Sequence, residues 1–222
     1  MKQMILFEDE YIIVLEKPAG TPVQSARIGT KDLVSMLKNY RKETEAIKGE
    51  PYIGVIHRLD QPVQGIVIFA KTKAAAADLS AQAANGTMEK YYLAVVCGQP
   101  KESQAQLTDY LLKDGKTNTS KIVAASLKGA KKAELTYKVI KKTQEKALLE
   151  IKLITGRHHQ IRVQLSGAGL PLENDQKYNP GAALSRVPVA LAAYKISFRH
   201  PRTKEQISLE IQPKGTSFDN FR

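Results

Sequence analysis

The chain has almost no cysteine and no long apolar run. Cys97 is the only cysteine among 222 residues, which excludes intramolecular disulfides and zinc clusters of several thiolates and indicates a reducing compartment. The longest apolar run, residues 187–194, contains Pro188 and is far shorter than the roughly 20 residues of a membrane span. The opening residues turn acidic at once and lack the apolar stretch of a signal peptide. We therefore expect a soluble cytoplasmic protein without membrane association.

Several common catalytic signatures are also missing. The sequence contains no Walker P-loop, no GxGxxG, no GxSxG and no Cys-His nucleophile motif. Its four histidines show neither an HxxxH nor any other short metal-binding spacing, so a metal site would need remote carboxylates. The histidine spacing therefore argues against a metal site. The histidines are His57, His158, His159 and His200.

Composition and length indicate one globular domain spanning residues 1–222. Hydrophobic residues make up 42% and charged residues 25%, which are ordinary globular values, and a chain of this length builds a core without disulfides. The net charge of +12 is concentrated: residues 113–162 carry 13 basic and 4 acidic side chains. Such a patch attracts polyanions such as RNA, although a solvated lysine-rich face is the alternative. Its centre comprises Lys128, Lys131, Lys132, Lys138, Lys141, Lys142 and Lys146.

Hydrophobic periodicity predicts an α+β fold with a mixed, mostly antiparallel central sheet flanked by a few helices. One helix should follow Thr30 as its N-cap and span 33–40, another should run from Thr72 to Asn85-Gly86, and residues 157–166 form a third candidate. The apolar segments typical of strands are 11–15, 65–70, 91–96, 133–139, 149–153, 189–198 and 207–211, with a hairpin around residues 143–145 joining two of them.

Two segments are candidates for chemistry. His57-Arg58-Leu59-Asp60 lies between two predicted strands, so Asp60 would sit in a loop held by rigid elements, where a reactive carboxylate is well placed. A turn aspartate that bonds its own backbone is the more common use of Asp beside Pro. The second segment, residues 155–162, reads TGRHHQIR. A glycine followed by so many donors at a helix start suits binding of phosphate or carboxylate, whereas an ordinary strand-to-helix turn would not account for its two arginines and two histidines.

Four segments together resemble, in order, the RluA-type family of RNA pseudouridine synthases. They are EKPAG at 16–20, HRLD followed by a glycine and an apolar strand at 57–72, KYYLAVVCG at 90–98, and TGRHHQIRV with a later Asp-x-x-Tyr at 155–178. Two departures stand out, because Val63-Gln64 replaces the usual Thr-Ser and Asn174-Asp175 replaces Gly-Asp. Only 15 residues precede EKPAG, so we expect no additional RNA-binding domain of the S4 type before it.

The resemblance implies a function and roles for individual residues. It implies isomerisation of specific uridines in rRNA or tRNA after base flipping, with no cofactor and no obligate protein partner. Asp60 matches the family's nucleophile, Arg162 the arginine that pairs with it, and Tyr92 the tyrosine that packs on the flipped uracil and is implicated in removing the C5 proton. Attack at ribose C1′, attack at base C6 and a glycal route remain open.

Further residues are expected to bind the RNA substrate. Arg58 matches the family arginine that enters the space vacated by the base, and the basic cluster would dock neighbouring phosphates. The expected substrate-binding residues are Arg58, His57, Ile161, Arg157, Gln160, Lys132 and Lys141. A catalytically silent RNA-binding protein on the same scaffold is the principal alternative. A nucleoside or glycoside hydrolase is a third reading, but it would need a second carboxylate motif that does not accompany HRLD.

Overall fold

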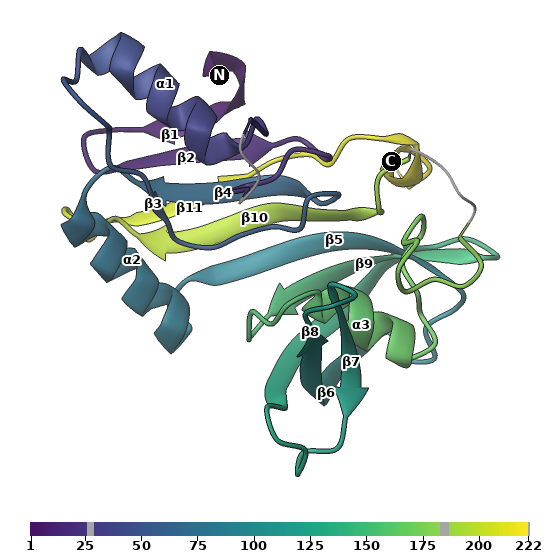
Figure 1. The fold of residues 1–222 in the computed structure, drawn as a ribbon. Coiled ribbons are helices and arrows are strands. Elements are labelled where there is room, and N and C mark those ends of the chain that lie inside the picture. The colour runs from purple at the N-terminus through teal and green to yellow at the C-terminus, as the bar shows by residue number, and fades with distance from the viewer. Residues whose placement is uncertain (26–28, 183–186, 222) are drawn as a thin grey trace. The chain divides into compact units, whose positions relative to one another are not determined.

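The computed structural model describes residues 1–25, 29–182 and 187–221. They divide into two compact units, one formed by residues 1–89 and 193–212, and the other by residues 90–192 and 213–222. Both units combine antiparallel strands with helices, and five strands follow one another in the second unit before its first helix, which confirms the predicted α+β class (Figure 1). That residues 1–222 act as one catalytic domain stays a prediction. None of the described helices is long and apolar enough to cross a membrane.

The first unit contains a sheet with strands in the order β1-β2-β4-β10, in which β3 also pairs with β4 and β11 with β10. Every ladder whose register is resolved is antiparallel, for example from Ile12 opposite Ala70 to Lys17 opposite Gly65 between β2 and β4. The elements are η1 (Lys2–Met4), β1 (Ile5–Glu8), β2 (Ile12–Lys17), α1 (Leu33–Glu45), β3 (Gly54–Val55), β4 (Gln64–Ala70), α2 (Lys73–Asn85), β10 (Leu191–Arg199) and β11 (Gln206–Glu210).

The helix signals in the first unit are largely confirmed. Thr72 caps α2 by accepting a hydrogen bond from the Ala75 amide at 3.1 Å, and the helix ends at Gly86 in the left-handed conformation, as Asn85-Gly86 predicts. The predicted cap of α1 was wrong by two residues. Asp32 rather than Thr30 is the N-cap, because its carboxylate accepts from the Ser35 amide at 2.7 Å, and an ionised acceptor suits the positive end of a helix.

The core of the first unit lies between α2 and the strands, and Figure 1 shows α2 alongside β3 and β4. Alternate residues of β2 and β4 face this helix, and the residues between them, on the opposite face of each strand, are buried as well. The sequences of both strands are therefore almost continuously apolar. Burying an aliphatic side chain contributes about 1.5–3 kcal/mol. The buried cluster comprises Ile12, Val14, Ile66, Ile68, Ala70, Ala75, Leu79, Met88, Ile196 and Phe198.

The second unit is an antiparallel sheet in the order β5-β9-β8-β6-β7, with α3 against β6 and β7 (Figure 1). The predicted strands at 91–96, 133–139 and 149–153 and the hairpin around 143–145 are confirmed, and the helix expected at 157–166 is shorter. Its elements are β5 (Glu89–Cys97), β6 (Gln104–Asp114), β7 (Thr119–Val123), β8 (Lys131–Lys142), β9 (Lys146–Leu153), α3 (Gln160–Gly167) and α4 (Thr216–Asp219).

Candidate active site

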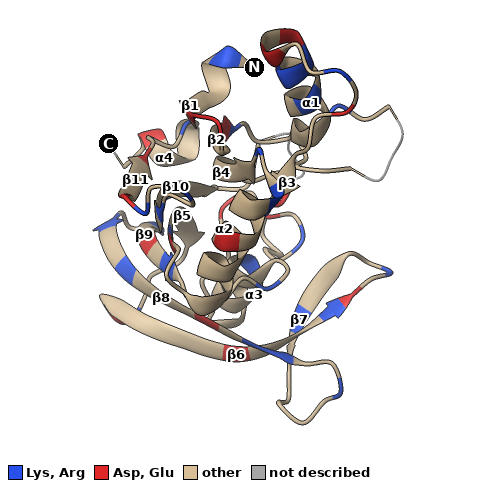
Figure 2. Cartoon of the chain, turned by 90° about the vertical axis from the view of Figure 1, so that its left-hand side faces the viewer, with Lys and Arg blue, Asp and Glu red and all other residues tan. Residues whose placement is uncertain are grey.

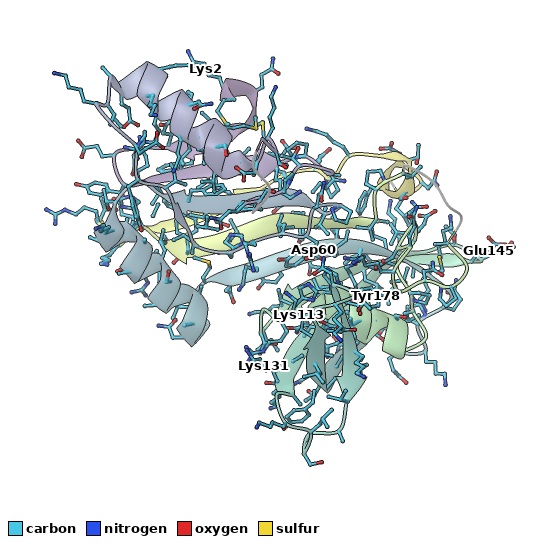
Figure 3. All side chains as sticks on the ribbon, viewed as in Figure 1. Lys2, Asp60, Lys113, Lys131, Glu145 and Tyr178 are labelled. Carbon is cyan, nitrogen blue, oxygen red and sulfur yellow. The ribbon has the colours of Figure 1, made fainter. Side chains whose placement is uncertain are left out.

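Asp60 lies in the loop between β3 and β4 of the first unit and is labelled in Figure 3. It is half-buried, and its carbonyl accepts a hydrogen bond from the Val63 amide at 3.0 Å, which closes a tight turn. Val63, one of the two departures from the family pattern, is buried beneath this turn. The turn expected of an aspartate beside proline is therefore present, and it is closed by the Asp60 backbone.

A fully buried lysine holds the Asp60 loop against a second loop. Nζ of Lys17, at the end of β2, donates to the carbonyl oxygens of Pro18 at 3.0 Å, Thr21 at 2.7 Å and Gln61 at 3.0 Å. The Gly20 amide also donates to the Gln61 carbonyl, at 2.8 Å, and the Gln61 side chain donates back to the Gly20 carbonyl at 2.9 Å. The EKPAG segment thus fixes the residue that follows Asp60.

Glycine is required at the start of β4, five residues after Asp60. Gly65 has φ +132°, and a Cβ there would lie 2.4 Å from the Ala193 carbonyl oxygen. No side chain fits at that separation, so the close approach of β4 to β10 depends on this glycine. The glycine of the HRLD motif therefore has a packing role, and it anchors the strand that carries the Asp60 loop.

The electrostatic setting of Lys17 couples it to Asp60. Burial lowers the pKa of Lys17 from its ordinary 10.5 to about 8, and the negative charge of Asp60 opposes this shift. No periodicity in the sequence distinguishes Lys17, and lysine is among the residues least often fully buried, so its burial was not predicted. The EKPAG motif identifies this segment in the sequence, and the structure shows what its lysine does there: it is buried and binds three backbone carbonyls.

Replacing Lys17 by methionine should destabilise the chain by roughly 2–4 kcal/mol, because three buried carbonyls lose their donor while the aliphatic volume is kept. Urea denaturation at pH 7 measures this difference. The matched control is Lys73→Met, an exposed lysine at the start of α2, which should change stability by less than about 0.5 kcal/mol. Equal stability of Lys17→Met and wild type would show that the three contacts contribute nothing.

Lys17 also predicts a pH dependence whose sign follows from its lowered pKa. Between pH 8 and 10.5 the unfolded chain binds a proton that the folded chain has released, so folding becomes more favourable as pH rises through this window. The unfolding free energy of wild type relative to Lys17→Met should therefore rise between those values, by at most about 3 kcal/mol. Urea denaturation of both proteins across this range measures it, and a constant difference would contradict the lowered pKa.

The other residues of HRLD have distinct surroundings. His57 is half-buried, and its Nε2 accepts a hydrogen bond from the Ile68 amide at 3.3 Å, so the ring is directed at β4. Arg58 is exposed and forms no hydrogen bond or ion pair with the part of the chain that the structure describes. The expected role of Arg58 toward RNA fits this exposure, whereas His57 has a structural contact as well. Both substrate roles stay predictions.

In the second unit, Arg162 on α3 forms a buried bidentate ion pair with Asp175. Its Nε donates to one carboxylate oxygen at 2.8 Å and its Nη2 to the other at 2.7 Å, and the two residues are 4% and 0% exposed. The guanidinium also lies 5.1 Å from the ring centroid of Tyr178. Asp175 was quoted in the sequence motif without a role, and its part in holding Arg162 was missed.

The departure at Asn174 has a simple structural interpretation. Asn174 has φ +62°, in the left-handed region, and asparagine is one of the few non-glycine residues that occupy it readily. It therefore substitutes for the usual glycine without changing the backbone. Asp175 directly follows and also accepts from the Lys177 amide at 3.0 Å. The loop geometry that this departure put in doubt is compatible with the pair to Arg162.

The TGRHHQIR segment is braced mainly by its own glutamine. Gln160 is buried, its Oε1 accepts from Thr155 Oγ1 at 2.8 Å and from the Arg157 amide at 2.9 Å, and its Nε2 donates to the Glu134 carbonyl at 3.0 Å. These bonds close the loop before α3. The structure thus gives Gln160 a positioning role, and its contact with substrate stays a prediction.

A hydrogen-bonded group joins this loop to β7. The Tyr178 hydroxyl accepts from the Ser120 amide at 2.7 Å and lies 2.7 Å from Nδ1 of His159. The Ser120 hydroxyl lies 2.8 Å from Nδ1 of His158, whose ring stacks on His159 with centroids 3.8 Å apart. The histidines therefore connect structural elements. No three ligand side chains come together as a metal site would require in the described parts of the chain.

The remaining predicted site residues all lie in the second unit. Tyr92 on β5 and Ile161 on α3 are buried at 6% and 5% exposure. Lys132 is exposed and paired with Glu134 at 2.9 Å, and Lys141 is exposed on the same strand, β8. Arg162, Ile161, Gln160 and Arg157 thus share one loop and helix, whereas Asp60, His57 and Arg58 share the loop before β4. The pairing of Asp60 with Arg162 stays a prediction.

Comparison with known proteins matches most of the chain. Residues 11–167 match the sequence model of the RNA pseudouridylate synthase family. The ribosomal large subunit pseudouridine synthase C of Vibrio vulnificus is 31% identical over 99% of this chain and 68% of its own length. The uncharacterised RNA pseudouridine synthase YlyB of Bacillus subtilis is 33% identical over 93% of this chain and 67% of its own.

A solved structure supports the fold. Human RNA pseudouridylate synthase domain containing 4 superposes with a TM-score of 0.79 over 95% of this chain and 88% of that chain, at 24% identity. The chain spans about two thirds of the length of its curated relatives, for example 64% of the Yersinia pestis enzyme. The match over residues 11–167 and the identity to the Vibrio enzyme establish the relationship. The chain belongs to the RNA pseudouridylate synthase family, whose members are isomerases acting on RNA.

Proposed function

We propose that this chain converts specific uridines of ribosomal RNA to pseudouridine, with Asp60 as nucleophile. The observation that carries the proposal is the Asp60 loop, which Lys17 and Gly20 fix from a second loop in a chain of this family. A reactive carboxylate must be held in place by groups that do not move with the substrate. The bond from Lys17 to the Gln61 carbonyl and the two bonds between Gly20 and Gln61 hold the residue next to Asp60 and support the proposal.

The chemistry conserves every atom of the nucleotide. The N1–C1′ bond of uridine breaks, the uracil rotates, and a C5–C1′ bond forms, while C5 loses a proton and N1 gains one. No oxidant, metal or imported group is needed. Asp60 supplies the nucleophile for C1′ or C6, or the carboxylate that assists a glycal route, and Arg162 supplies a permanent positive charge that keeps a carboxylate ionised.

Further residues contact the substrate in the proposed mechanism. Tyr92 packs against the flipped uracil and takes part in removal of the C5 proton. Arg58, exposed beside Asp60 in sequence, enters the space that the base leaves and repays part of the few kcal/mol that flipping costs. Ile161 limits water in the pocket, and the lysines of β8, including Lys132 and Lys141, approach the phosphate backbone.

Ribosomal RNA is the proposed substrate because curated relatives are named ribosomal large subunit pseudouridine synthases. The cytoplasm is the proposed location. The test maps pseudouridine in ribosomal and transfer RNA from cells with and without the gene, and complements the deletion with wild type. Loss and recovery of a site in large-subunit rRNA supports the proposal, whereas loss confined to tRNA would overturn the substrate.

A second assay separates the proposal from its rivals. Purified protein is incubated with large-subunit rRNA carrying tritium at uracil C5, and release of tritium into water is measured. Tritium release with no free uracil is expected. Binding without release would favour a silent RNA-binding protein, and free uracil as product would indicate a hydrolase.

A further inference from the structure

A basic hollow in the second unit is lined by residues that the proposed mechanism does not use, although one of them, Arg157, is among the expected substrate-binding residues. It has a volume of about 270 Å³ and is lined by Leu111, Leu112, Lys113, Ser120, Gly129, Lys131, Gly156, Arg157 and His158. The walls come from the β6–β7 hairpin, the turn before β8 and the loop before α3. Figure 3 shows the labelled Lys113 and Lys131 on neighbouring strands of this unit.

The charged side chains that line this hollow are all basic. Three of its side chains are cationic and none of its lining residues is a carboxylate. Lys113, Lys131 and Arg157 form no ion pair with the described residues. This differs from Lys132, next to Lys131 but on the opposite face of β8, whose ammonium is paired with Glu134 at 2.9 Å. Figure 2 marks further Lys and Arg positions on β7 and the surrounding loops.

The exposed arginine of the hollow is restrained at one edge of its guanidinium. Nε of Arg157 donates to the carbonyl of Lys132 at 2.9 Å, and its backbone amide donates to Gln160. The two terminal nitrogens of the guanidinium make no hydrogen bond with the described residues. A guanidinium held in this way presents parallel donors to a phosphate. Gly129 and Gly156 leave room for such a group, since nothing but Leu112 approaches either position.

The size of the hollow limits what it accommodates. Sites for whole drug-sized ligands measure about 300–1,000 Å³, so 270 Å³ suits a single phosphate with part of its sugar better than a nucleotide with its base. A backbone phosphodiester carries one negative charge, and the phosphates on either side of it in the strand add the further negative charge that three cations can balance.

We infer that this hollow binds one backbone phosphate of the RNA substrate, held jointly by Lys113, Lys131 and Arg157. The inference rests on the proposed function for its substrate class. One fixed phosphate sets the register of the strand, and so contributes to the choice of uridine through shape rather than base identity. This differs from a diffuse basic face, where each cation would contact its own phosphate.

The first experiment detects occupancy by NMR, with the isotope-labelled full chain titrated with inorganic phosphate and with a uridine nonanucleotide. The amides of Gly129 and Gly156 should shift with both ligands in wild type and with neither in the Lys113→Gln/Lys131→Gln variant, which keeps the Arg157 hydrogen bond. Shifts with inorganic phosphate alone would indicate a small-ligand site and overturn the RNA assignment. Absence of any shift in wild type would overturn the site itself.

The second experiment counts phosphates through the salt dependence of RNA affinity. Each phosphate contact to single-stranded RNA adds about 0.7 to the slope of log K against log[salt]. A variant without the cations of Lys113, Lys131 and Arg157 should have a slope lower by about 0.7 if the three share one phosphate. The slope should fall by about 2 if each cation binds a separate phosphate. The control is Lys121→Gln, an exposed lysine beside Ser120 on the opposite face of β7, which should leave the Gly129 and Gly156 shifts unchanged. A drop of about 2 would contradict the inference.

Failure of the inference and failure of the proposed function are distinguishable. Both measurements report binding and require no isomerisation. Occupancy of the hollow by RNA in a chain that releases no tritium would overturn the function and keep the site. If the variant lacking the cations of Lys113, Lys131 and Arg157 keeps the RNA affinity and salt slope of wild type, and wild type releases tritium, the proposed site is overturned and the proposed function is kept.

Discussion

Replacing Asp60 by asparagine should reduce pseudouridine formation by at least about 10⁴-fold while the chain stays folded. The amide keeps the size of the side chain but has no nucleophilic oxygen anion, and loss of a nucleophile typically removes most of the catalytic advantage. The Asp60 carboxylate is half-buried, and the bond that closes its turn involves the backbone carbonyl, so the loop geometry survives. Tritium release from C5-labelled RNA measures the rate, and urea denaturation checks the fold.

The matched control is Asp114→Asn. Asp114 also lies at a turn, where its carboxylate accepts from the Lys116 amide at 2.9 Å and from Thr117 Oγ1 at 2.8 Å, and asparagine preserves such turns. Its activity should remain within about twofold of wild type. RNA affinity of Asp60→Asn should also remain near wild type, because the asparagine removes no cation. An active Asp60→Asn protein would eliminate the nucleophile assignment, whereas inactivity of both variants would point to a general loss of structure.

The elements that were predictable from sequence are those whose signals are local. The helix α2 has an N-cap at Thr72 and a left-handed end at Gly86, both within the segment itself. In contrast β6 and β7 were not predicted, because Asp109 interrupts the alternation of apolar residues in β6 and the only fully buried residue of the short strand β7 is polar. β6 forms by pairing with β8, and β7 by pairing with β6 and through the Tyr178 hydroxyl, which accepts from the Ser120 amide across 58 residues.

In the candidate site, too, local motifs were recognisable in the sequence and contacts between distant residues were not. The segments containing Asp60 and Arg162 were identified through their motifs, but the groups that hold them were not. Lys17 reaches the Gln61 carbonyl over 44 residues, and Asp175 reaches Arg162 over 13. Such contacts depend on where strands end in space, which residue spacing does not encode. The sequence therefore singles out candidate reactive residues through their motifs, whereas the residues that position them emerge only from the structure.

The buried pair of Arg162 and Asp175 yields the largest expected effect on stability. Replacing either residue by leucine should lower the free energy of unfolding by roughly 3–5 kcal/mol, because the partner keeps a buried charge without its counter-ion. The double replacement removes both charges and keeps apolar volume, so its stability should return to within about 1–2 kcal/mol of wild type. Urea denaturation of the two single variants and the double variant measures the coupling.

Activity of the same double variant separates the two roles of Arg162. If the arginine only held the Asp175 loop, restoring stability would restore pseudouridine formation. The proposed mechanism also pairs its charge with Asp60 during the reaction, so the double variant should be stable yet slowed by at least about 10²-fold in tritium release. Lys at position 162 keeps the charge without the bidentate fork, and partial activity of Arg162→Lys would attribute the loss to charge. Full activity of the stable double variant would remove Arg162 from the mechanism.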